Sequence, residues 1–207
     1  DLYGLYRAPG TGEHFVSIAG PFLGAPHAAM AMEKLVVLGA RRLWVTGWCG
    51  SLQPDLPIGG MVIPDSAVSE EGTSAHYPVD QALIQTDFRL NRRLELALEG
   101  CRIPFRKGKV WTTDALYRET ASKILAYREQ GVLAVDMEMS ALMTVALYRS
   151  VSVAGLLVVS DELSDLNWRP GFRDSRLRKS FRFAADILLK VALSAGDNKR
   201  NKGNRPP

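Results

Sequence analysis

The chain has 207 residues, of which 46% are hydrophobic and 23% charged, and this suits one globular domain with a sizeable core. The formal net charge is +4 at pH 7, but residues 196–207 hold four basic residues and one acidic residue, so the rest is nearly neutral. Because no aromatic residues lie among these basic residues, the composition argues against a nucleic-acid partner, and the longest apolar runs are too short to span a bilayer.

Short β-rich runs alternate with longer amphipathic segments along the chain. Apolar runs predict strands at residues 15–19, 43–46, 61–63, 109–112, 132–135 and 151–160. Helical periodicity and terminal Pro or Gly residues predict helices at residues 26–38, 118–130, 139–149 and 177–191. The segment Gly-Trp-Cys-Gly at residues 47–50 is expected to form a turn after its strand.

This alternation of strands and helices predicts an α/β sandwich. The run at residues 151–160 is apolar throughout, which is typical of a strand buried on both faces of a mixed or parallel sheet. We find no internal repeat and no linker within residues 1–195, so we predict a single domain there, followed by a disordered basic tail at residues 196–207.

The two cysteines, Cys49 and Cys101, are far apart in the sequence and form no metal-binding or disulfide pattern. We therefore expect free thiols in a reducing cytoplasm, without a signal peptide, a membrane partner or a metal site.

Four polar or glycine-rich segments follow predicted strands, at the edge where open α/β sheets bind ligands. They are residues 47–50, 112–114, 136–138 and 160–162. Each of their side chains also has a purely structural interpretation. Glu138 and Asp161 could cap helices or loops, while Trp48 and Cys49 could be core residues. Spacing alone leaves these alternatives open.

Seven segments taken together resemble the purine nucleoside/uridine phosphorylase family, which includes the methylthioadenosine and adenosylhomocysteine nucleosidases. They are residues 16–20 with 23–26, 47–52, 59–64, 71–74 with 76–77, 111–114, 135–138 and 159–161. The most specific are Asp-Met-Glu at the start of a helix and Ser-Asp after the most hydrophobic strand. The resemblance implies a three-layer α/β sandwich around a mixed central sheet, and an enzyme that cleaves the N-glycosidic bond of a nucleoside.

The resemblance also implies roles for individual residues. Glu138 corresponds to the glutamate that binds the ribose hydroxyls, and Met137 to the methionine packed against the ribose. Asp161 corresponds to the acid that protonates or hydrogen-bonds N7 of the leaving base in purine-cleaving members. Because cleavage builds positive charge on the sugar and negative charge on the base, Glu138 and Asp161 are the catalytic candidates.

Further substrate-binding candidates follow from the same segments. They are Gly24, Gly47, Trp48, Cys49, Thr113 and His76. The resemblance implies no cofactor and no metal, although phosphate can be a co-substrate. It also implies a small-molecule nucleoside as ligand and a homo-oligomer, either a dimer or a trimer of dimers.

The sequence departs from the family at the expected phosphate site. Val45 stands where phosphorylases carry an Arg, and Trp48 where they carry a phosphate-binding hydroxyl. Neither offers a dianion the charge or donors that it needs, and Arg41 and Arg42 should lie at the far end of the strand. The family's first strand–loop–helix unit is also absent from this sequence, which begins at Asp1 and not at Met. This start suggests truncation and puts activity itself in question.

Three functions fit these observations. The first is a phosphorylase with an altered phosphate site, and the second is a nucleosidase that uses water, with Trp48 in the vacated anion pocket. The third is a non-catalytic oligomeric protein that binds a nucleoside. The substitutions at the phosphate site favour hydrolysis, and the sugar and base residues favour an enzyme.

Overall fold

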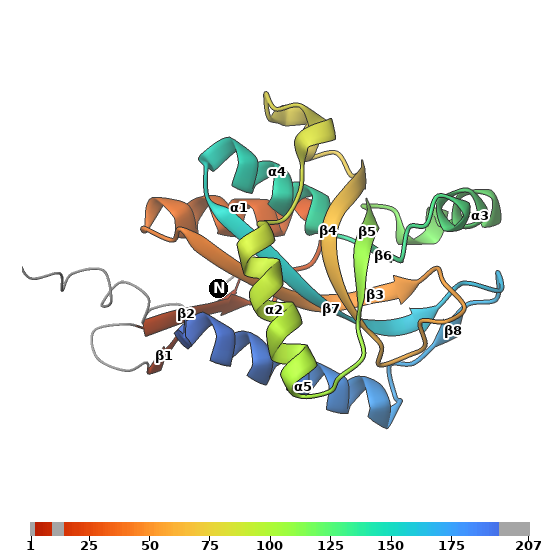
Figure 1. Cartoon of the computed structure of the whole chain (residues 1–207). Coiled ribbons are helices and arrows are strands. Elements are labelled where there is room, and N and C mark those ends of the chain that lie inside the picture. Colours follow the sequence, from red (N-terminus) through yellow and green to blue (C-terminus); the bar gives the residue numbers. More distant parts are fainter. Residues whose placement is uncertain (1–2, 10–14, 195–207) are drawn as a thin grey trace, which may run out of the picture.

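A computed structural model describes residues 3–9 and 15–194; the predicted tail lies outside these ranges (Figure 1). The strands are β1 (Gly4–Pro9), β2 (Phe15–Gly20), β3 (Arg42–Ser51), β4 (Met61–Glu70), β5 (Arg106–Thr113), β6 (Ala134–Asp136), β7 (Ser152–Glu162) and β8 (Arg169–Pro170). The α-helices are α1 (Ala25–Val37), α2 (Phe88–Gly100), α3 (Ala121–Glu129), α4 (Met139–Arg149) and α5 (Ser175–Ser194). Short 3-10 helices are η1 (Ser74–His76), η2 (Gln81–Leu83) and η3 (Leu116–Arg118).

The central sheet is mixed, as predicted. Its strand order is β3-β6-β5-β4-β7-β8, and β3 also pairs with β7, so that five strands close into a ring. The β3–β7, β4–β5 and β5–β6 pairs are parallel, whereas β3–β6, β4–β7 and β7–β8 are antiparallel. Strands β1 and β2 form a separate antiparallel pair.

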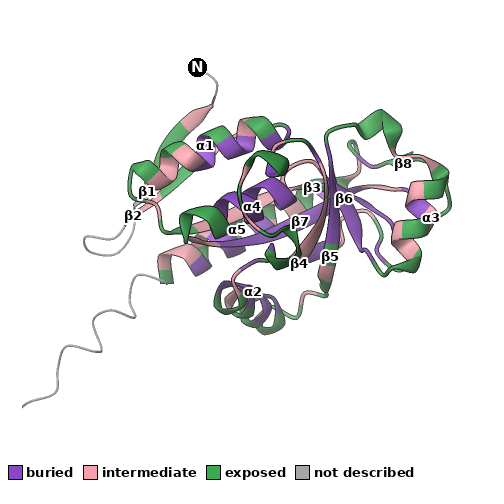
Figure 2. Cartoon of the chain, turned by 90° about the horizontal axis from the view of Figure 1, so that it is seen from above, coloured by how far each residue is buried: buried purple, intermediate pink, exposed green. Residues whose placement is uncertain are grey.

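Strand β7 lies between two helical layers, and this confirms its predicted central place. Residues 153–160 are all buried, and their side chains alternate between two cores. Val153, Leu157 and Val159 pack with α1 and α4, while Leu156 and Val158 pack with α2 and α5. Figure 1 shows these helix pairs on opposite sides of β7, and Figure 2 shows most of β7 and α4 as buried. The three-layer α/β class is therefore confirmed.

The predicted turn at residues 47–50 is wrong, because these residues lie inside β3. Strand β3 pairs with β7 from Arg42 to Ser51, with a register shift between Cys49 and Gly50. Backbone hydrogen bonds to a fully buried neighbour outweigh the turn preference of the two glycines. The strand predicted at residues 61–63 likewise extends to Glu70, past Pro64, with an irregularity between Pro64 and Ala67.

Helix α2 is an element that the sequence patterns did not predict. Asp87 caps it, since its carboxylate accepts hydrogen bonds from the backbone N–H groups of Arg89 (2.8 Å) and Leu90 (3.1 Å). Its buried leucines recur every fourth residue, at positions 90, 94 and 98. The predicted helix at residues 118–130 begins later, at Ala121, because the 3-10 turn η3 precedes it.

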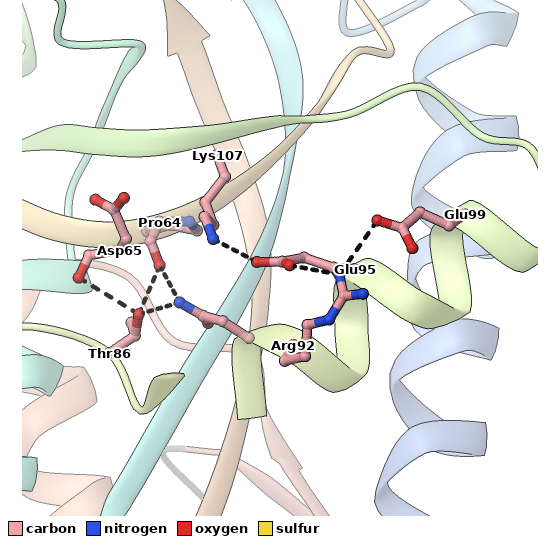
Figure 3. Close-up of polar contacts among 8 residues, drawn as sticks. Pro64, Asp65, Thr86, Arg92, Glu95, Glu99 and Lys107 are labelled. Carbon is pink, nitrogen blue, oxygen red and sulfur yellow. Dashed lines mark hydrogen bonds and ion pairs between the residues drawn. The ribbon is translucent and has the colours of Figure 1, made fainter. Parts of the chain in front are cut away.

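Polar contacts fix α2 against the sheet (Figure 3). The Thr86 hydroxyl donates to the Pro64 carbonyl of β4 at 2.8 Å. Glu95 of α2 binds Lys107 of β5 at 2.6 Å and Arg92 at 3.0 Å. The leucines of α2 belong to the core on the side of the sheet opposite α4. None of the helices in the described ranges is long and apolar enough to cross a membrane.

Candidate active site

The N-terminus of α4 is capped by a residue other than Glu138. Asp136 caps this helix: its Oδ2 accepts hydrogen bonds from the backbone N–H groups of Glu138 (2.9 Å) and Met139 (2.6 Å). The Thr112 hydroxyl donates to the other Asp136 oxygen at 2.7 Å and fixes its orientation. The capping role considered for Glu138 therefore belongs to Asp136, and the Glu138 side chain makes no capping bond.

The carboxyl of Glu138 is held by a loop that is distant in sequence. Its Oε1 accepts a hydrogen bond from the backbone N–H of Gly24 at 2.6 Å. Gly24 lies between β2 and α1 with φ of 82° and ψ of 154°, a conformation that favours glycine. The structure thus brings together two of the predicted site residues, Gly24 and Glu138.

Several carboxylates gather around Glu138. Burial raises the pKa of Glu138 to about 7; the charges of Asp136 and Asp114 act in the same direction, and the backbone N–H of Gly24 opposes them. Burial also raises the pKa of Asp136 to about 6, against the hydrogen bonds that it accepts. Asp114 is anchored by the Gly72 N–H, which donates to its Oδ2 at 2.8 Å. This edge of the sheet therefore favours positive charge.

Asp161 lies at the end of β7, half-buried, and both of its oxygens accept hydrogen bonds. The Ser160 hydroxyl donates to Oδ1 at 2.6 Å, and the indole N–H of Trp168 donates to Oδ2 at 2.9 Å. Asp161 pairs with Gly50 of β3, where a Cβ atom would lie 3.1 Å from Asp161 Oδ2. Gly50 therefore lets the carboxylate lie against the backbone of β3.

Cys49 is affected by two acids of the site, Asp136 and Asp161. It is buried in the core beside α4, and burial raises the pKa of its thiol, with Asp136 and then Asp161 adding in the same direction. The charges of both carboxylates thus act on the Cys49 thiol. Cys49 and Cys101 are free, as predicted, and Cys49 is the small buried side chain of the structural interpretation.

Residues 4–191 match the sequence profile described as the Phosphorylase superfamily. A guanosine phosphorylase from Halorubrum lacusprofundi is 26% identical over 180 residues, which cover 87% of this chain and 75% of that protein. A DeoD-type purine nucleoside phosphorylase from Exiguobacterium sp. is 30% identical over 197 residues, covering 92% of this chain and 82% of that protein. The chain belongs to the phosphorylase superfamily.

The fold of this phosphorylase-superfamily enzyme agrees with that assignment. The crystal structure of uridine phosphorylase from Vibrio fischeri ES114 aligns with a TM-score of 0.84 and 26% identity, covering 93% of this chain and 80% of that chain. The P knowlesi homologue of P falciparum PNP, at 21% identity, has the same fold with a TM-score of 0.77, covering 94% of this chain and 79% of that chain. The resemblance read from the seven segments is therefore confirmed at the level of family and enzyme class.

The structure separates Trp48 from Glu138. Trp48 is 51% exposed, and the centroid of its ring lies 5.7 Å from that of Phe172 and 6.3 Å from that of Phe181 in α5. Neighbouring residues of a strand point to opposite faces, and Cys49 points toward α4. Trp48 therefore packs on the α5 side, and its place in an anion pocket stays a prediction.

The other predicted residues lie at varying distances from this centre. Met137 is half-buried directly before Glu138, and Thr113 is buried at the end of β5, where its hydroxyl accepts from the Ala115 N–H at 3.2 Å. Gly47 lies inside β3. His76 is exposed in η1, and no hydrogen bond within the described ranges joins its ring to the Glu138 cluster.

The structure places the residues at which the sequence departs from the family pattern along β3. Val45 is half-buried in the middle of β3. The Arg41 guanidinium donates to the carbonyls of Val36 (3.0 Å) and Ala40 (2.9 Å), at the opposite end of β3 from Gly50, as predicted. In the described part of the chain, no group of three or more His, Cys, Asp or Glu residues is arranged to hold a metal ion.

Two residues connected to Asp161 were missed by the sequence analysis. Trp168 is 58% exposed and holds Asp161, and Glu119 is half-buried between η3 and α3. Burial raises the pKa of Glu119 to about 7, and the Asp161 carboxylate adds to this rise. Neither residue belongs to a motif, so only their spatial neighbourhood identifies them.

A cavity of about 520 Å³ lies elsewhere, between the start of α2 and the end of α4. Its lining includes Asp87, Phe88 and Ser152, and it contains neither Glu138 nor Asp161. We place the active site at Glu138 nevertheless, because acids with raised pKa values gather there and glycine loops approach them.

Proposed function

We propose that this enzyme cleaves the N-glycosidic bond of a purine-type nucleoside, with water as the nucleophile. The observation that carries the proposal is the Glu138 carboxyl, which Asp136 releases from capping and which the Gly24 N–H holds at 2.6 Å. A side chain held in this way can accept hydrogen bonds from sugar hydroxyls without disturbing α4.

The charges of the site suit the electronic course of this reaction. As the C1′–N bond lengthens, positive charge develops on the sugar, and the ionised Glu138 with Asp136 and Asp114 nearby would stabilise it. Met137, next to Glu138, would pack against the sugar. Asp161, one strand away, would bind the edge of the base, and Ser-Asp at this place supports a purine, as do the names of the guanosine and purine nucleoside phosphorylases above.

The same charges support water over phosphate. A phosphate dianion would approach a group of carboxylates, and Val45 and Trp48 offer it neither charge nor a useful set of donors. Arg41 is bound to backbone carbonyls at the far end of β3. Phosphorolysis is the second candidate, favoured by the printed names of the relatives. The predicted homo-oligomer and cytoplasmic location stay predictions.

The test is the release of free base from inosine, guanosine, adenosine, methylthioadenosine and uridine, with and without phosphate. We expect purine release that needs no phosphate, and a loss of about 10²-fold or more in Asp161→Asn. Asp186→Asn, an exposed acid on α5, is the matched control and should keep full activity. Release that requires phosphate would refute hydrolysis, and cleavage of uridine alone would refute the purine assignment.

A further inference from the structure

Trp168 lies in the turn between β7 and β8, and this turn brings its indole to Asp161. Strands β7 and β8 are antiparallel, with Asp161 opposite Pro170. The indole N–H of Trp168 donates to Asp161 Oδ2 at 2.9 Å. The backbone N–H of Gly171 donates to the Ser160 carbonyl at 2.8 Å, which fixes the chain directly after β8. The contact between Trp168 and Asp161 therefore crosses a turn that is anchored at its end.

The turn is also held by contacts that do not involve the Trp168 indole. The Asp165 carboxylate accepts a hydrogen bond from the backbone N–H of Asn167 at 3.1 Å and pairs with the Arg169 guanidinium. The Asn167 side-chain amide donates to the Asp165 carbonyl at 3.3 Å. These contacts are sufficient to shape the turn, so the indole N–H of Trp168 is not needed to close it.

The position of the Trp168 ring gives its N–H little value for folding. Trp168 is 58% exposed, and the centroid of its ring lies 6.2 Å from that of Phe172. Water can satisfy an exposed N–H equally well, so the net stabilisation from its hydrogen bond is small. The packing of the ring on Phe172 does not require the N–H either. The hydrogen bond to Asp161 is therefore better explained by what it does to the carboxyl.

The Asp161 carboxyl is held at both oxygens and still has sites for a ligand. The Ser160 hydroxyl donates to Oδ1 at 2.6 Å, and Trp168 donates to Oδ2. A carboxylate has about four lone-pair sites, so each oxygen keeps one for a substrate or for a proton. The terminal torsion of an Asp side chain is broad when nothing restrains it. Two donors on different oxygens therefore fix the plane of this carboxyl.

We infer that Trp168 is a positioning residue of this enzyme: its indole N–H fixes the plane of the Asp161 carboxyl, whose remaining lone pairs then meet the edge of the base. This inference rests on the proposed function, which gives Asp161 that contact, and it adds a residue that the family resemblance did not indicate. It applies to water and to phosphate as nucleophile, because both reactions release the same base. A displacement of about 1 Å can lower a rate by about 10²-fold, so the orientation of the carboxyl matters for activity.

The variant Trp168→Phe removes the N–H and keeps an aromatic ring next to Phe172. With guanosine, we expect kcat/KM to fall by about 10- to 10²-fold, in a protein that circular dichroism shows to be folded. With 7-methylguanosine, it should fall by less than about 3-fold, because the methyl group covers N7 and the base leaves as a neutral molecule without help from an acid. Trp44→Phe is the matched control: Trp44 packs in the core beside α2 and α5, and this change should affect neither substrate.

A double-mutant cycle measures whether Trp168 acts through Asp161. Asp161→Ala removes the carboxyl that Trp168 holds. Adding Trp168→Phe to this variant should therefore change kcat/KM with guanosine by less than about 2-fold. If Trp168→Phe costs the same factor with and without the Asp161 carboxyl, Trp168 acts independently and the inference is wrong. Equal losses with guanosine and 7-methylguanosine would overturn it as well, while the proposed function stands.

A failure of the proposed function has a different signature. A wild-type enzyme that cleaves neither nucleoside, or an Asp161→Ala variant that cleaves guanosine at the full rate, would contradict the proposed function, and the inference would fall with it. Release that requires phosphate would refute water as the nucleophile and nothing more. The wild type and Trp168→Phe would then be compared in phosphate, with the same expected losses.

Discussion

Replacing Glu138 by Gln should make the enzyme much less active and, above neutral pH, more stable. The amide oxygen of Gln can still accept the hydrogen bond from the Gly24 N–H, so the change removes charge and little else. We expect kcat/KM to fall by about 10²- to 10³-fold, as is typical when one preorganised electrostatic contact to a transition state is lost.

The gain in stability follows from the pKa of Glu138, which burial raises from its ordinary 4.5 to about 7. A raised folded-state pKa contributes stability below the unfolded value of 4.5, and this contribution is lost as the pH rises through 7. The difference between 4.5 and 7 corresponds to roughly 3 kcal/mol at 1.36 kcal/mol per pKa unit, and partial exposure reduces it to about 1 kcal/mol. Glu138→Gln should recover this free energy at pH 8 and little of it at pH 5.

Thermal unfolding at pH 5 and pH 8 measures this difference directly. For a domain of this size, about 1 kcal/mol shifts Tm by roughly 2–4 °C. The Tm of Glu138→Gln minus the Tm of the wild type should therefore be roughly 2–4 °C larger at pH 8 than at pH 5. Asp186→Asn serves again as control, since that acid is exposed and should show no such pH dependence. An equal effect of Glu138→Gln at both pH values would refute the claim that the fold strains this carboxylate.

Two further changes test the groups that hold Glu138. Asp136→Ala should destabilise the protein by about 1–2 kcal/mol through loss of the α4 cap, measured by urea unfolding, and Asp136→Asn should destabilise it less. If ionised Glu138 stabilises the sugar cation, kcat/KM should increase as Glu138 loses its proton near pH 7. Asp136→Asn should shift this increase toward lower pH, because it removes a charge that raises the pKa of Glu138. Gly24→Ala should lower the free energy of unfolding by about 1–3 kcal/mol because of the positive φ alone, since the new Cβ would meet only Pro26 Cδ at 3.9 Å. The same change should weaken nucleoside binding. Gly100→Ala, which has open space around it, is the control and should change neither stability nor binding. A tolerant Gly24→Ala, or an unshifted pH profile in Asp136→Asn, would contradict this account.

Local sequence patterns predicted the helices that bury one face and the strand that is buried on both faces. The apolar run of β7 and the helical periodicities of α1, α4 and α5 are such patterns, and all four elements are present. The turn expected at residues 47–50 failed because the pairing of β3 with β7 is non-local and no local rule contains it. Helix α2 was missed although Asp87 and the leucines at positions 90, 94 and 98 provide a cap and a buried stripe.

The site was predictable only where residue type alone carries the information. Glu138 follows the end of β6 and Asp161 lies at the end of β7, so their place at one edge of the sheet could be expected. That Asp136 and not Glu138 caps α4 depends on which carboxylate meets the N–H groups, which adjacent residues cannot reveal. Glu119 escapes any sequence pattern, because the charge of Asp161, 42 positions along the chain, acts on it only in the folded protein.

The raised pKa values also bear on which nucleophile the site can use. Ionised Glu138 is unfavourable in the free enzyme because of burial and the charges of Asp136 and Asp114. A sugar that becomes cationic relieves both effects, so the site stabilises the transition state more than the neutral ground-state nucleoside. A phosphate dianion in the same place would add negative charge to the acids and cancel part of this gain, whereas water adds none. The hydrolysis that we propose would therefore use the same arrangement that destabilises ionised Glu138 in the resting enzyme.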